Sequence, residues 1–361
     1  MVLSKENSTL FSLLRHAIWQ NCDGEQIDFN LTTPEWQRLI ENAASMGVLA
    51  VAFDALPKGE ALPGLTKELI IRWGLSVQRF EDRNRRQRIA LRELITYFRE
   101  NQIEVLLLKG LGLAENYPFP THRECGDLDI YLFGDYEKGN QVIEALGIEV
   151  GKEGTKHSHF FFKGIPVENH LSFLDVNSSQ TNRNLEVHLH RILKEQGYET
   201  IMIDDFEVRI PTPDFTALFL TRHDITHFVA SGLVLRHFCD MALFFSRNAD
   251  RINFASFRKI ITEEHQYDLF RSFTQLAHLY LGMPDIPLQV PDKCKAITER
   301  VLYDTLNNEA RKIDMEELLK WWVPKRKLFS AIILFHSKWK YDLIDKWGFY
   351  HRLVLSFKAL L

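Results

Sequence analysis

The sequence predicts an α+β protein: a small mixed sheet with its own helices, flanked by N- and C-terminal helical regions. Apolar residues recur at helical spacing through most of residues 1–100 and again through 211–361. Between them, residues 101–210 contain short apolar or alternating runs of strand length. A chain of 361 residues also exceeds the usual size of one hydrophobic core. We therefore expect three regions, with boundaries near residues 100 and 210.

The N-terminal region reads as three helices. Ser8 and Thr9 are candidate caps for the first helix, and Thr33 with Pro34 marks the start of the second. The third helix is expected over residues 65–99. It contains a basic run at residues 83–88, which fits either a solvated helix face or a binding site for polyphosphate or RNA. We favour the solvated face.

A strand followed by a glycine turn opens the middle region. Residues 103–108 form an apolar run that ends at Lys109 and Gly110, and a short helical segment is expected over 111–116. A strand, a glycine turn and a helix start together bring backbone N–H groups toward a phosphate. The layout therefore predicts a phosphate-binding turn.

The next predicted strand, residues 126–132, carries two carboxylates. Because side chains alternate along a strand, Asp127, Asp129 and Tyr131 share one face and the intervening apolar residues line the other. The two carboxylates stand roughly 6–7 Å apart along the strand, close enough to hold one or two divalent cations. Taken alone, the same pattern also fits an edge strand with a solvated acidic face.

Four short motifs in this region belong together: Lys109-Gly110, Tyr117-Pro118, Arg123 and Asp127-Leu128-Asp129. With them the chain resembles the polymerase-beta-type nucleotidyltransferases, and most closely a poorly characterised bacterial nucleotidyltransferase family. The resemblance implies a polymerase-beta-like core and Mg²⁺- or Mn²⁺-dependent transfer of a nucleotidyl group from a nucleoside triphosphate to a hydroxyl, releasing pyrophosphate. It also implies that Asp127 and Asp129 bind the metal, and that Lys109, Gly110 and Arg123 contact the triphosphate.

The resemblance further implies a third carboxylate on a strand beside the two aspartates. Glu168 fits this place, in a predicted hairpin of residues 158–162 and 165–171 joined by a Lys163-Gly164 turn. In the resembling family an acidic residue is followed two positions later by histidine, as Glu168 is by His170. Glu186 is the rival, but its surroundings have helical spacing, so we expect Glu168 to be the metal ligand and catalytic base.

Two other functions compete with this one. The superfamily usually has a serine in the glycine turn and often before the first aspartate, whereas this chain has Leu111 and Gly126. A catalytically silent relative that binds a nucleotide or a protein is therefore one alternative. The other is a metal-dependent phosphohydrolase built on His223 and Asp224, since His223 and His227 are i, i+4 on a predicted helix. That helix lacks a His-Glu-x-x-His motif, so we favour a packing role for its histidines.

The C-terminal region is again helical. Arg236 and Asp240 are spaced for an i, i+4 ion pair. Further helices are expected near residues 253–266, 268–282, 294–310 and 315–336. The last stretch, 338–361, has aromatic residues on one face and lysines mainly elsewhere. We favour core or a subunit interface for it over a membrane surface or a partner protein.

Composition excludes some classes of protein. A net charge of −4 gives no overall attraction to nucleic acid. No apolar run approaches the length of a spanning helix, and the first residues lack a signal-peptide pattern. The four cysteines have no Cys-x-x-Cys spacing, which predicts a reduced, cytoplasmic protein without structural zinc. The sequence does not identify the hydroxyl acceptor: a sugar phosphate, a protein side chain, an antibiotic and an RNA end all suit the reaction.

Overall fold

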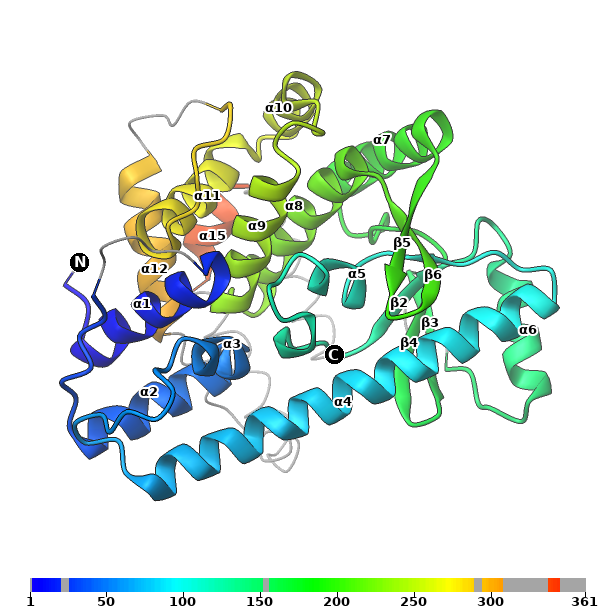
Figure 1. The fold of residues 1–361 in the computed structure, drawn as a ribbon. Helices are drawn as coiled ribbons and strands as arrows, with labels where there is room; N and C mark the ends of the chain where they lie inside the picture. Colours follow the sequence, from blue (N-terminus) through cyan, green and yellow to red (C-terminus); the bar gives the residue numbers. More distant parts are fainter. Residues whose placement is uncertain (1, 21–25, 152–155, 289–293, 308–336, 345–361) are drawn as a thin grey trace, which may run out of the picture.

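A small mixed sheet lies beside a large body of helices, and one long helix runs along both (Figure 1). The computed structural model describes residues 2–20, 26–151, 156–288, 294–307 and 337–344. The predicted α+β architecture is confirmed, with a mixed sheet and helices before and after it.

The N-terminal region has the three predicted helices, with slightly shifted starts, and a short additional one. They are α1 (Lys5–Trp19), α2 (Thr33–Ser45), α3 (Leu49–Asp54) and α4 (Lys67–Glu100). Ser4, not Ser8 or Thr9, caps α1, because its hydroxyl accepts a hydrogen bond from the Asn7 N–H at 3.4 Å. The cap of α2 is Thr32, whose N–H donates to the Glu35 carboxylate at 2.7 Å. Helix initiation thus follows the side chain that can reach an unpaired backbone group.

The main sheet has the order β1-β2-β4-β3. Its strands are β1 (Leu106–Leu107), β2 (Leu128–Tyr131), β3 (His157–Phe162) and β4 (Ile165–His170). The central pair β2–β4 is parallel and the other two pairs are antiparallel. The β3–β4 hairpin turns at Lys163 and Gly164, with φ of 51° and 75°, as two-residue hairpin turns require. The predicted hairpin is confirmed.

The two faces of the sheet meet different cores. Leu107, Leu128 and Ile130 pack in the smaller core together with the C-terminal half of α4. Leu106 and Tyr131 belong to the larger core of the helical body. Asp129 lies on the same face as Tyr131 because the two are two positions apart on β2. The carboxylate face of the sheet is therefore turned toward the helical body.

Helix α4 contributes to both cores. Trp73 and Val77 pack in the larger core, whereas Leu94 and Phe98 pack in the smaller one. This long element ends at the first predicted boundary but packs in both cores, and the divisions near residues 100 and 210 stay predictions.

The remaining elements lie near the main sheet or belong to the helical body. Near the sheet are α5 (Leu111–Ala114), the 3₁₀ turn η1 (Pro120–His122), α6 (Tyr136–Ala145) and a separate two-stranded sheet of β5 (Tyr198–Ile203) and β6 (Phe206–Pro211). Helix α7 (Gln180–Gln196) packs in the larger core of the helical body. The C-terminal helices are α8 (Pro213–Ala230), α9 (Leu235–Arg247), α10 (Phe254–Glu263), α11 (Tyr267–Leu281), α12 (Cys294–Asn307) and α15 (Lys338–Asp342).

The basic run on α4 is not simply a solvated face. Arg88 is buried and forms ion pairs with Glu115 at 2.8 Å and Asp204 at 3.1 Å. Gln87 is also buried, and its amide donates to the Cys125 carbonyl at 3.1 Å. The favoured interpretation is wrong for this half of the run, because α4 passes under the loop that leads into β2.

The end of the chain is described only in part. Trp339 of α15 packs edge-on against Phe228, with ring centroids 5.4 Å apart. Lys340, expected on the polar side, is buried and pairs with Asp304 at 2.6 Å. Most of the predicted amphipathic stretch (345–361) and the predicted helix 315–336 lie outside the described residues. Within the described residues, no helix has the length and apolarity needed to cross a membrane.

Candidate active site

The parallel pairing of β2 and β4 assembles a carboxylate cluster. Asp129 and Glu168 face each other in the register of the two strands. One carboxylate oxygen each of Asp127, Asp129 and Glu168 lies within 4.8 Å of the other two. The structure thus brings together the three carboxylates selected from the sequence, in an arrangement able to hold a divalent cation.

Asp129 is the fully buried member of the cluster. Its Oδ1 lies 3.1 Å from Lys109 Nζ and 3.0 Å from His170 Nε2. Burial alone would raise the pKa of Asp129, but Lys109 and the hydrogen bond from His170 hold this pKa below its usual range. Oδ2 has no hydrogen-bond partner among the described residues. A buried, ionised oxygen without a partner fits a metal ligand, because a bound cation would supply the missing interaction.

The other two carboxylates are half-buried, and their pKa values are shifted in opposite directions. Burial, together with the neighbouring charge of Asp129, raises the pKa of Asp127. Burial also acts to raise the pKa of Glu168, but a hydrogen bond from His170 lowers it overall. The repulsion felt by Asp127 is the kind that a divalent cation relieves.

Lys109 lies at the end of the β1 segment, beside the glycine turn. Burial acts to lower the pKa of its ammonium, but Asp129, Asp127 and Glu168 together raise this pKa. Gly110 has φ of 65° and ψ of −112°, a conformation that strongly favours glycine. An added Cβ at Gly110 would stand 3.4 Å from the Asp127 carbonyl oxygen. Such a contact is an ordinary one, so the positive φ rather than crowding favours glycine in this turn.

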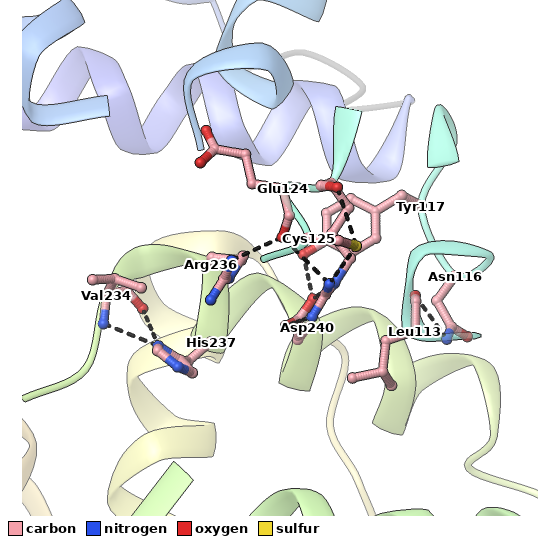
Figure 2. A network of polar contacts seen from close by, with 10 residues as sticks. Leu113, Asn116, Tyr117, Glu124, Cys125, Val234, Arg236, His237 and Asp240 are labelled. Atoms are coloured by element: carbon pink, nitrogen blue, oxygen red, sulfur yellow. Dashed lines mark hydrogen bonds and ion pairs between the residues drawn. The ribbon is translucent and has the colours of Figure 1, made fainter. Parts of the chain in front are cut away.

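Arg123 has a different position from the one expected. Figure 2 shows its neighbours around Asp240, which lies on α9. The Arg123 Nε–H and Nη2–H groups each donate to Asp240 at 2.7 Å, and the Tyr117 hydroxyl donates to the same carboxylate at 2.7 Å. Both charged side chains are buried. With its Nε–H and Nη2–H groups engaged in this way, Arg123 ties the loop before β2 to α9, and the bidentate phosphate contact expected of it stays a prediction.

The predicted ion pair between Arg236 and Asp240 is also absent, because Asp240 is engaged by Arg123. Arg236 instead donates from Nη1 to the Glu124 carbonyl at 2.8 Å, as Figure 2 shows. Its buried Nε has no hydrogen-bond partner among the described residues. A pocket reaches from the glycine turn to this arginine, lined among others by Lys109, Asp127 and Arg236. Its spacing from Asp240 predicted an ion pair and gave no sign of a ligand-binding role for Arg236.

Glu186, the rival third carboxylate, is not in the cluster. It lies on α7, where its two oxygens accept hydrogen bonds from the Phe173 and Leu174 N–H groups at 2.9 Å each. His190 Nε2 lies 3.1 Å from the same side chain. Glu186 therefore holds the loop after β4 in place.

Two further residues border the cluster. His157 Nδ1 lies 3.6 Å from Glu168, across the β3–β4 hairpin. Lys156 is the residue before His157. Burial is the main cause that lowers the pKa of the Lys156 ammonium, and the positive charge of Lys109 lowers it further. The contact of His157 with Glu168 crosses the hairpin, so the sequence spacing of His157 and His159 does not predict it.

A small mixed sheet whose parallel strand pair lies beside a glycine turn is consistent with a nucleotidyltransferase-like fold. The chain belongs to a family described as uncharacterised nucleotidyltransferases, whose profile matches residues 32–282. The match includes every residue of the carboxylate cluster and the glycine turn. No curated protein and no solved structure was found to match the chain. The chain is thus assigned to the nucleotidyltransferases at the level of the family.

Proposed function

We propose that the protein is a Mg²⁺-dependent nucleotidyltransferase that moves a nucleotidyl group from a nucleoside triphosphate to a hydroxyl acceptor and releases pyrophosphate. The observation that carries the proposal is the cluster of Asp127, Asp129 and Glu168 oxygens within 4.8 Å, including a buried oxygen of Asp129 without a partner. Oxygen-only ligands of this kind suit Mg²⁺ or Mn²⁺.

In this proposal Asp127 and Asp129 hold the metal. The bound ion would neutralise phosphate charge and lower the pKa of the attacking hydroxyl. Glu168 shares the site and accepts the proton of the acceptor hydroxyl. The hydrogen bonds from His170 and Lys109 fix the orientation of Asp129. His170 and Lys109 thus keep Asp129 ionised and aligned before the substrate arrives.

The triphosphate is assigned to the pocket beside the carboxylates. Lys109 supplies a positive charge and the Gly110 turn allows close approach of the backbone. Arg236 lines the same pocket with an unpaired Nε–H, and we assign to it the phosphate contact first expected of Arg123. Arg123 acts as a positioning residue through its ion pair with Asp240.

A double-label assay tests the reaction class. Each of the four nucleoside triphosphates, labelled on the α- or the γ-phosphate, is incubated with Mg²⁺ and acceptors of four classes: sugar phosphates, aminoglycosides, an RNA with a free 3′ end, and proteins. Nucleotidyl transfer puts the α-label on the acceptor and the γ-label in pyrophosphate.

The Glu144→Gln variant is the matched control, since Glu144 is an exposed carboxylate on α6 away from the cluster. Transfer that persists in Glu144→Gln and is lost in Glu168→Gln supports the proposal. The γ-label on the acceptor would identify a phosphotransferase instead. Nucleotide binding with no transfer to any of the four classes would favour a catalytically silent relative.

A further inference from the structure

A second group of metal-ligating side chains lies outside the carboxylate cluster. His223 and His227 are one turn apart on α8, and His237 comes from the start of α9. One ring nitrogen of each of these histidines lies within 4.8 Å of the other two. The ring centroids of His223 and His227 are 4.4 Å apart, and those of His227 and His237 are 5.3 Å apart. Three imidazoles from two helices thus converge on one point.

The free ring nitrogens of this group favour a ligand. His237 Nδ1 lies 3.3 Å from the Val234 carbonyl and 3.1 Å from the Val234 N–H, which leaves Nε2 on the other edge of the ring (Figure 2). The Val234 N–H can donate to Nδ1, which places the ring proton on Nε2. Metal binding through Nε2 selects the other tautomer, in which Nδ1–H donates to the Val234 carbonyl, the usual arrangement of a ligating histidine. In the described part of the chain, no hydrogen bond uses a ring nitrogen of His223 or His227.

The surroundings keep all three rings neutral, as metal binding requires. Burial, reinforced by neighbouring positive charges, lowers the pKa of His227 to about 4 and that of His237 to about 3. The same causes lower the pKa of His223 well below its usual range. One of the nearby cations, Lys109, is already paired with Asp129. The pocket wall also carries Asp224, whose buried carboxylate has no hydrogen-bond partner among the described residues.

We infer that His223, His227 and His237 form a binding site for a divalent transition-metal ion of the Zn²⁺ class, separate from the carboxylate site for Mg²⁺. Three imidazole nitrogens select Zn²⁺, Co²⁺ or Ni²⁺ over Mg²⁺, which prefers oxygen. Bonds of about 2.0–2.1 Å place ligand nitrogens about 3.3 Å apart, so small side-chain movements close the site. Three protein ligands leave a fourth position open. His223 and His237 also line the pocket that Asp127 lines.

The spacing of His223 and His227 alone favoured helix packing. His237 favours a metal site instead, because it supplies a third nitrogen from another helix. The inference does not depend on the proposed reaction, since it concerns binding of a different ion by different residues.

The test uses the full wild-type chain with excess Mg²⁺, so that the carboxylate site is occupied and the ion pair of Lys109 with Asp129 is kept. Zn²⁺ binding is measured by calorimetry, and Co²⁺ is used as a spectroscopic probe of nitrogen ligation. We expect one equivalent of Zn²⁺ and a visible Co²⁺ band. Adding His227→Ala should weaken Zn²⁺ binding by more than about 100-fold, because even outer-shell changes cost about 10- to 100-fold. His188→Ala, which removes a histidine of α7 that belongs to no such group, should leave the affinity unchanged.

Absence of stoichiometric Zn²⁺ binding to the wild-type chain in excess Mg²⁺ would overturn the inference. So would binding that survives His227→Ala, because the ion would then be held elsewhere, for example by His157, Glu168 and His170. Thermal unfolding checks that His227→Ala is folded. If it is not, His223→Gln replaces it, with the same expected loss of Zn²⁺ affinity.

Discussion

Glu168 lies directly beside Asp129, on the strand that pairs in parallel with the Asp-x-Asp strand. The parallel register puts both side chains on the same face of the sheet, and that face is turned toward the helical body. A buried carboxylate next to a second one is costly unless a cation joins them. The pairing therefore links the sheet topology to the proposed metal site.

The Glu168→Gln change should separate binding from chemistry. Nucleotide binding should be nearly unchanged, while turnover with any acceptor falls by at least about 100-fold, because the acceptor hydroxyl loses its base. Single-turnover kinetics of α-label transfer measures the effect, with Glu144→Gln as the control. Equal turnover in the two variants would remove Glu168 from the chemistry.

Lys109→Met should weaken nucleotide binding. The ammonium is the cation that lies between the carboxylates and the triphosphate pocket, and a hydrogen bond from a charged group is worth about 10- to 100-fold in affinity. Calorimetry with Mg²⁺–ATP measures the dissociation constant. Lys259→Met, an exposed lysine on α10, serves as the control. If the two variants bind ATP equally well, Lys109 serves only to pair with Asp129.

Arg123→Met should destabilise the fold rather than change nucleotide affinity directly. Removing one partner of a buried ion pair leaves Asp240 charged and unpaired, at a cost of about 3–5 kcal/mol in the free energy of unfolding. Arg85→Met, which breaks an exposed pair with Asp82 on α4, should cost less than about 1 kcal/mol. Urea unfolding followed by circular dichroism compares the two. Similar losses would mean that the buried pair contributes little.

His122 should make the stability depend on pH. Burial acts to lower its pKa, but hydrogen bonds with Asp54 at 2.8 Å and Glu81 at 2.9 Å raise it overall. The charged form is thus favoured in the folded state. The resulting stabilisation is complete below about pH 6.5, the unfolded value, and is lost as pH rises through the higher folded pKa. The difference in Tm between the wild type and His122→Gln should therefore shrink as pH increases. A difference independent of pH would point to packing alone.

Local patterns predicted the strands of the main sheet, its β3–β4 hairpin and the face that carries the carboxylates. The turn at Lys163 and Gly164 and the alternation at Asp127 and Asp129 are set by neighbouring residues, so the sequence contains the signal. The β5–β6 hairpin was missed, although the turn residue Asp204, with φ of 55°, was available as a cue.

Long-range partners could not be read from spacing. Arg236 and Asp240 are four positions apart, yet Asp240 pairs with Arg123, which is 117 positions away. The same holds for His237, which joins His223 and His227 only because α8 and α9 pack together. Arg88 was assigned to a solvated face because periodicity does not reveal its distant partners, Glu115 and Asp204.

Binding of Mg²⁺–nucleotide to the Asp127→Asn, Asp129→Asn double variant is the most direct test of the account. Calorimetry with Mg²⁺ and each of the four nucleoside triphosphates is compared between the wild type, the double variant and Glu144→Gln. We predict metal-dependent binding of at least one nucleotide to the wild type and to Glu144→Gln, and no detectable Mg²⁺-dependent binding to the folded double variant. Unchanged affinity in the double variant would contradict the assignment of these aspartates to a metal–nucleotide site.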